Sequence, residues 1–195
     1  MGDAVDLREL DRHTLGVIDR VLSGAGDDDL GRPTPCAGWT LADLLRHQIS
    51  ENHGFAIAAR EGAAPDWNLG EQTEDLFAGY RQSVVDFVDA FGADDLLERK
   101  LTIREFGTLP GTVVATMHLI DSVVHGWDFA RTLGVPYEPT PAAVQACFPM
   151  SERIPDDDRT RAAGQSFGHV VAAPDGVGDL DRLVALLGRD PAWRP

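Results

Sequence analysis

The chain has 195 residues, of which 43% are hydrophobic and 25% charged, and its formal net charge is -15 at pH 7. This length is enough for one domain with a sizeable core that needs neither disulfides nor structural zinc knuckles. The acidity excludes an ordinary nucleic-acid-binding surface, which needs a basic footprint, and no apolar run approaches the roughly 18 residues that cross a bilayer. We therefore expect small-molecule partners, no nucleic acid and no membrane.

The two cysteines and the first residues of the chain indicate in which compartment of the cell the protein is found. Cys36 and Cys147 have no C-x-x-C spacing, so free thiols are expected rather than a disulfide framework or a cysteine-rich metal site. The segment Met1–Asp6 lacks the basic and apolar regions of a signal peptide. Together these features predict a cytoplasmic protein.

Apolar residues recur with helical spacing in four stretches of the chain, which predicts a mainly α fold. The expected helices cover 6–22, 40–60, 71–91 and a stretch that contains 115–131. Thr40 and Asp43 form a capping pattern at the start of the second helix. Gly134, followed by Pro136, ends the fourth.

Shorter elements are expected between and after these helices. Two extended pieces within 101–109 predict a short hairpin or an irregular crossover before the fourth helix. Later in the chain we expect a short helix at 141–150, a charged and exposed segment at 151–161, an extended segment at 167–174 and a last helix at 179–187. The chain is thus divided into a bundle, 1–150, and an extension, 151–195, packed on it as one structural unit.

The fourth helix carries a row of ionisable residues. At about 100° per residue, one narrow strip contains His118, Asp121, His125 and Asp128, and apolar residues flank it. An unpaired charge in a bundle core is costly and needs a compensating partner. A divalent cation is one such partner, because Asp121 and His125 are one turn apart and can converge on a single point. A satisfied polar network and a face turned to water are the alternatives.

A third ligand is expected from the second helix. His47 lies on its inward face, one turn before Glu51, and Gly54 leaves space two turns further on. If the two helices pack together, His47, Asp121 and His125 supply two imidazoles and one carboxylate. This is the ligand set of many open catalytic sites, and it accepts zinc, nickel, iron or manganese.

The remaining candidate residues have simpler interpretations. We expect His13 at a helix surface, His53 in solvent and His169 in an ordinary loop, with a late substrate contact as the alternative for His169. Cys36 lies just before the second helix, where a helix N-terminus can lower the pKa of a thiol. It is interpreted as a small buried residue, with a reactive thiol as the alternative.

Four motifs together resemble a known group of proteins. They are TPCAGWT at Thr34–Thr40, LLRH at Leu44–His47, DSVVHGWDFAR at Asp121–Arg131 and LLGRDP at Leu186–Pro191. With these motifs, the chain resembles actinobacterial metal-binding proteins of the DinB/YfiT-like superfamily over nearly its whole length. Within that superfamily it is similar to the N-terminal domain of mycothiol-dependent maleylpyruvate isomerase.

The resemblance implies a DinB-like four-helix bundle of up-down-down-up type with a short C-terminal α/β extension. It also implies a divalent metal, zinc first and nickel second, held by His47, Asp121 and His125. The isomerases have glutamate where this chain has Asp121, and the shorter side chain draws the cation toward the fourth helix. His118 is then a fourth ligand, a residue that holds a ligand in place, or a general base.

Three functions are compatible with such a site. In the first, the cation deprotonates a small thiol cofactor such as mycothiol, and the thiolate adds to an activated double bond in a transferase or isomerase reaction. In the second, a metal-bound water hydrolyses an ester or amide. In the third, the metal only stabilises a binding or stress-associated protein. Exposed faces of the bundle also allow a homodimer.

Overall fold

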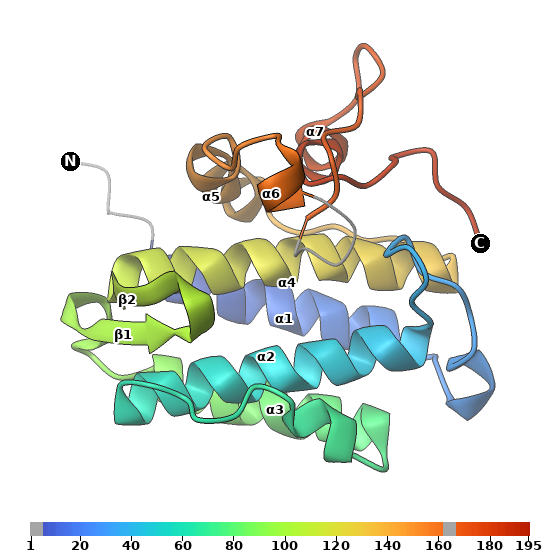
Figure 1. Ribbon diagram of the computed structural model, residues 1–195. Helices are drawn as coiled ribbons and strands as arrows, with labels where there is room; N and C mark the ends of the chain where they lie inside the picture. Colours follow the sequence, from blue (N-terminus) through green and yellow to red (C-terminus); the bar gives the residue numbers. More distant parts are fainter. Residues whose placement is uncertain (1–5, 162–166) are drawn as a thin grey trace.

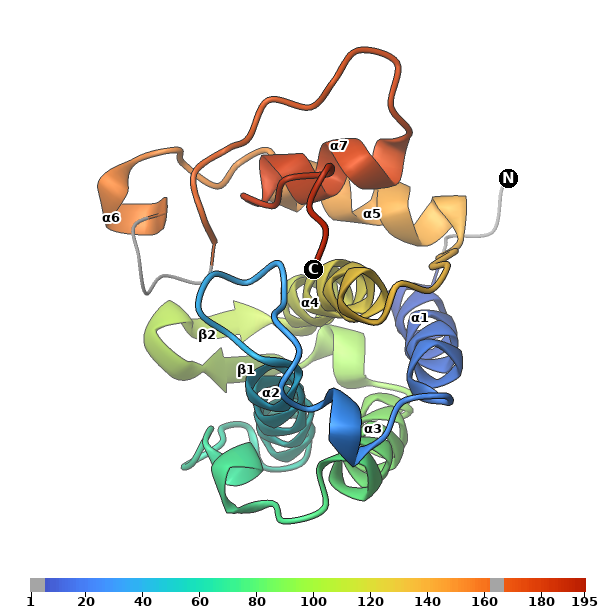
Figure 2. The same ribbon diagram turned by 90° about the vertical axis from the view of Figure 1, so that its right-hand side faces the viewer.

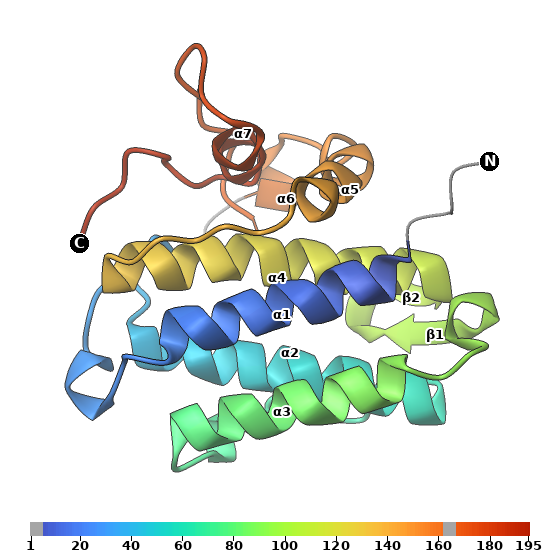
Figure 3. The same cartoon turned by 180° about the vertical axis from the view of Figure 1, so that it is seen from behind.

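The computed structural model describes residues 6–161 and 167–195 (Figure 1). Its main body is a bundle of four long helices: α1 (Leu7–Leu22), α2 (Leu41–Glu61), α3 (Leu76–Phe91) and α4 (Gly111–Leu133). α1 packs chiefly against α4, and α2 packs chiefly against α3. α1 and α4 run in one direction and α2 and α3 in the other, which confirms the up-down-down-up order (Figures 1 and 3).

The helices begin and end at residues whose side chains or backbone satisfy the terminal peptide groups. Thr40 accepts a hydrogen bond from the backbone N–H of Asp43, and the Asp43 side chain accepts one from the backbone N–H of Thr40. This capping box, which the sequence predicted, defines the first turn of α2. Gly134 ends α4 with a φ of 70°, in the left-handed region that favours glycine.

The third helix is shorter than predicted. The expected range was 71–91, but α3 begins at Leu76, where the Asp75 side chain accepts a backbone hydrogen bond and caps the helix. The preceding Leu69–Gln72 forms a separate 3-10 helix. Its Gly70 lies so close to the backbone of α2 that a Cβ would overlap a carbonyl oxygen. The segment is therefore held across α2 and does not continue into α3.

A short antiparallel hairpin precedes α4, as one of the two sequence alternatives predicted. It consists of β1 (Lys100–Ile103) and β2 (Gly107–Pro110). A single 3-10 turn, Arg104–Phe106, forms the tip of the hairpin, and Arg104 has a positive φ of 38°. From this tip the Arg104 side chain reaches Glu51 on α2.

The C-terminal elements lie across the outer face of α4 (Figures 1 and 2). α5 (Pro141–Ser151) and α7 (Asp179–Leu186) pack on each other and on α4. Leu119 and Val123 of α4 share a second apolar core with residues of both helices. In the part of the chain that the structure describes, every helix is too short or too polar to cross a membrane.

Two residues of the predicted exposed segment 151–161 are buried, Ser151 at its start and Arg161 at its end. Arg161, in the single turn α6 (Asp158–Arg161), is 1% exposed. Its guanidinium donates to the backbone carbonyls of Pro155, Gly168 and Leu186, and so joins three parts of the extension. The predicted extended segment 167–174 has an irregular backbone that makes one hydrogen bond to the end of α7.

Seen along their axes, the four long helices surround the main core (Figure 2). Gly54 lies on the face of α2 where the sequence predicted open space. A Cβ at Gly54 would overlap the indole ring of Trp67, which packs edge-on against Phe55 at 5.3 Å between ring centroids. The expected space is therefore filled by Trp67.

Gly54→Ala is expected to lower the free energy of unfolding by about 1–3 kcal/mol, because the new methyl group overlaps the Trp67 ring. Gly16→Ala is the matched control, since Gly16 lies inside α1 and a Cβ added there would have no atom within 4 Å. Alanine at that position is expected to raise the same free energy by up to about 1 kcal/mol. Urea unfolding measures both changes, and equal effects would contradict this packing.

Candidate metal centre

The three predicted ligands come together between α2 and α4. One donor atom from each of His47, Asp121 and His125 lies within 4.8 Å of the others. Asp121 Oδ1 is 3.6 Å from His47 Nε2 and 3.3 Å from His125 Nε2. Donors that share a cation at about 2.0–2.2 Å are themselves roughly 3–4 Å apart, so this donor set fits a divalent ion. The aspartate, although shorter than glutamate, faces both imidazoles.

The charged forms of Asp121 and His125 stabilise each other. Burial alone would raise the pKa of Asp121, but His125 and His47 hold that pKa well below its usual range. Burial would lower the pKa of His125, but Asp121 and Asp128 raise it well above its usual value. The Asp121 carboxylate is thus ionised at neutral pH. Gln48 fixes its orientation by donating a hydrogen bond of 2.5 Å to Oδ2.

A buried ion pair holds His125 from the other side. Nδ1 of His125 lies 2.9 Å from Oδ2 of Asp128, whose side chain is fully buried. Arg189, which follows α7, donates to the same oxygen at 3.2 Å. When Nδ1–H donates its hydrogen bond to Asp128, Nε2 is left to face Asp121, as the free nitrogen of a metal-binding histidine would. The C-terminal segment therefore contributes to the geometry of the cluster.

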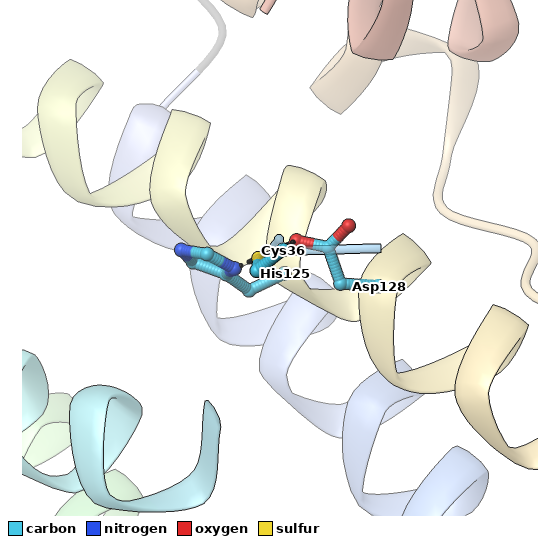
Figure 4. A group of neighbouring side chains, drawn as sticks. All are labelled: Cys36, His125 and Asp128. Atoms are coloured by element: carbon cyan, nitrogen blue, oxygen red, sulfur yellow. Dashed lines mark hydrogen bonds and ion pairs between the residues drawn. The ribbon is translucent and has the colours of Figure 1, made fainter. Parts of the chain in front are cut away.

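Cys36 belongs to the group around Asp128, which also contains Arg189, and not to the cluster of His47, Asp121 and His125. Its thiol donates to Asp128 Oδ2 at 3.3 Å, and Arg189 Nη2 lies 3.6 Å from the sulfur. Figure 4 shows one ring nitrogen of His125 turned toward Cys36 and Asp128 and the other turned away. Cys36, His125 and Asp128 also have donor atoms within 4.8 Å of one another. The Arg189 guanidinium already supplies positive charge to this group.

His118 lies apart from the cluster. It is completely buried, its Nδ1 is 2.6 Å from Asp11 Oδ2, and its Nε2 is 3.0 Å from Asn52 Oδ1. Its ring stacks on Phe87 with 3.5 Å between centroids. Both nitrogens are thus engaged in a polar network of the core, which was one of the sequence alternatives for this strip. The geometry does not support His118 as a fourth ligand or a general base.

The other histidines lie away from the cluster. His13 is exposed, and His169 is exposed beside Asp156, in agreement with the simpler interpretations. His53 was expected in solvent, but its side chain is only 25% exposed and lies 3.6 Å from Asp86 of α3. The packing of α2 against α3 accounts for this difference.

A groove of about 660 Å³ opens beside His47. Trp39 and Trp67 form part of its walls, and the Trp39 ring lies 5.1 Å from the His47 ring. Glu51 and Arg104 also line it. Burial and the nearby Asp121 carboxylate raise the pKa of Glu51. The groove gives a small molecule access to the His47 side of the cluster.

Sequence reasoning missed several residues that shape this site. Arg189 stands in the LLGRDP motif, but nothing in its spacing indicates that it returns to α4. Gln48 and Arg104 carry no sequence signal for their contacts with Asp121 and Glu51. Each of these contacts joins residues far apart in the chain.

The fold and the cluster define a helical-bundle protein with two histidines and an aspartate gathered between two helices. The model of the mycothiol maleylpyruvate isomerase N-terminal domain family matches residues 12–130, a range that contains all three clustered residues. The chain belongs to this family. The resemblance found in the sequence motifs is thereby confirmed.

Individual proteins are similar to the chain over most of its length. Two uncharacterized proteins from two strains of Mycobacterium tuberculosis are each 26% identical over 170 residues, which is 87% of this chain and 90% of theirs. The crystal structure of the mycothiol-dependent maleylpyruvate isomerase superimposes with a TM-score of 0.64 at 16% identity, over 87% of this chain and 77% of that one. A mutant of that enzyme gives 0.60 at the same identity and coverage. The likeness to both solved structures concerns the fold.

Arg189→Met is expected to lower the free energy of unfolding by about 3–5 kcal/mol, because it leaves the buried Asp128 carboxylate without its guanidinium partner. Asp128→Asn is expected to cost a similar amount, and the double variant less than the sum. Arg12→Met, which breaks an exposed pair with Glu9, is the control and should cost less than about 1 kcal/mol. Urea unfolding of the four variants tests this, and additive losses would contradict a direct pairing.

Proposed function

We propose that the protein is a divalent-metal-binding, mycothiol-dependent enzyme that catalyses an isomerase or transferase reaction. The proposal rests on the three donor atoms of His47, Asp121 and His125, which lie within 4.8 Å of one another in a member of the mycothiol maleylpyruvate isomerase N-terminal domain family. A solved structure with the same fold carries the name mycothiol-dependent maleylpyruvate isomerase. Zinc is the first choice of metal and nickel the second.

The donor set suits a catalytic site. Three protein ligands leave an open position on a four-coordinate ion, whereas structural zinc sites are closed by four. A cation bound there would supply Lewis acidity, which lowers the pKa of a bound thiol toward neutral pH. The groove at His47 provides a route for a small thiol and its substrate to this side of the cluster.

The protein's own side chains keep the ligands ready. Asp128 accepts a hydrogen bond from Nδ1–H of His125, and Gln48 donates one to Asp121. His118 is assigned to the core and not to proton transfer, because Asp11 and Asn52 engage its two nitrogens. We therefore place the chemistry at the cluster and the groove.

Metal analysis of protein purified without an affinity tag tests the ligand assignment. The unaltered protein is expected to carry a single divalent cation, and His47→Ala and His125→Ala are expected to lose it, because each removes one of three protein ligands. His53→Ala is the matched control, since His53 lies on the same helix as His47 but beside Asp86. Full occupancy in both ligand variants would show that the assignment is wrong.

Calorimetry with mycothiol separates a thiol-dependent enzyme from a protein whose metal is only structural. Mycothiol is expected to bind the zinc-loaded protein and to lose its binding after treatment with a chelator, because the sulfur needs the cation as its partner. An absence of binding to the zinc-loaded protein would exclude the thiol-dependent function and leave the metal site intact.

A further inference from the structure

The His47 imidazole has a charged pair on its outer side that the proposed function does not use. Nδ1 lies 3.8 Å from Oε1 of Glu51, one helical turn further along α2. Arg104, at the tip of the hairpin, donates to the same oxygen. The Glu51 side chain is only 9% exposed, so its charge depends on this arginine for compensation.

Arg104 is held in place for this contact. Its φ of 38° is uncommon for a residue other than glycine. The guanidinium carbon lies 4.4 Å from the centroid of the Trp67 ring, within the range of a cation–π interaction. Trp67 is in turn fixed by its close approach to Gly54. A strained backbone that persists beside a candidate site suggests a functional role for the residue that carries it.

The other imidazole of the cluster has a matching arrangement. His125 Nδ1 faces Asp128, and Asp128 is bound by Arg189 from the C-terminal segment. In both cases a carboxylate faces the outer nitrogen of the histidine, and an arginine from a distant part of the chain holds the carboxylate. Asp128, at 2.9 Å, forms a hydrogen bond with its histidine, and such a bond fixes the tautomer and the ring orientation of a metal-binding histidine. Glu51, at 3.8 Å, acts on the His47 ring through its charge.

We propose that Glu51 and Arg104 are positioning residues of the metal centre. Glu51 holds the His47 ring with Nε2 toward Asp121, and Arg104 holds Glu51. This inference rests on the proposed function and deepens it. Glu51 and Arg104 line the groove, whereas Asp128 is fully buried. A small molecule in the groove therefore contacts the residues that orient His47.

Cobalt(II) is the probe, with its affinity measured by competition with a chelator and its coordination followed by visible absorption. Glu51→Gln is expected to weaken cobalt binding by about 10–100-fold and to change the visible spectrum, because the amide no longer places a negative charge beside Nδ1 of His47. Arg104→Ala is expected to weaken binding in the same direction. Arg104→Lys is expected to recover part of the loss, since it keeps the charge.

Glu71→Gln is the matched control, because Glu71 lines the same groove and its loss changes the charge by the same amount. Its affinity should stay within about twofold of the unaltered protein. Equal weakening in Glu71→Gln and Glu51→Gln, or an unchanged affinity and spectrum in Glu51→Gln and Arg104→Ala, would overturn the positioning role. Cobalt binding that survives His47→Ala would instead overturn the ligand assignment, so the two failures are distinguishable.

Discussion

The buried imidazole of His125 is held between two carboxylates, and the rest of the site depends on this constraint. Nε2 faces Asp121 at 3.3 Å, and Nδ1 faces Asp128 at 2.9 Å. Two carboxylates in a largely dry environment need positive charge nearby. Arg189 supplies it to Asp128, and the two histidines supply it to Asp121, where we propose that a cation binds. The tail beyond α7 is thereby part of the site, and not only a cover for the bundle.

The contrast between His118 and His125 shows how neighbouring helices decide the role of a residue. Both lie on the same strip of α4, about two turns apart. His118 meets Asp11 of α1 and Asn52 of α2, which satisfy it inside the core. His125 lies near the groove, where one nitrogen remains directed toward His47 and Asp121. Helical periodicity identifies the strip, but it does not show which partners each position meets.

The sequence predicted the parts of the structure that depend on local signals. Helix periodicity and the capping box at Thr40 placed α2 well, and the one-turn spacing of Asp121 and His125 predicted that their side chains converge, as they do at 3.3 Å. The cap at Asp75 was overlooked, and the predicted third helix therefore began too early.

Contacts between distant residues could not be predicted in the same way. Arg104 and Glu51 are 53 positions apart, and Arg189 and Asp128 are 61 apart, so no local pattern links them. Gly54 was interpreted as open space because the sequence does not show that Trp67 returns to cover it.

X-ray absorption spectroscopy of the zinc-loaded, thiol-free protein tests the position of the cation most directly. We expect nitrogen and oxygen ligands at about 2.0–2.2 Å with no sulfur. A zinc–sulfur distance of about 2.3 Å would place the ion at Cys36 and contradict the assignment of His47, Asp121 and His125 as ligands.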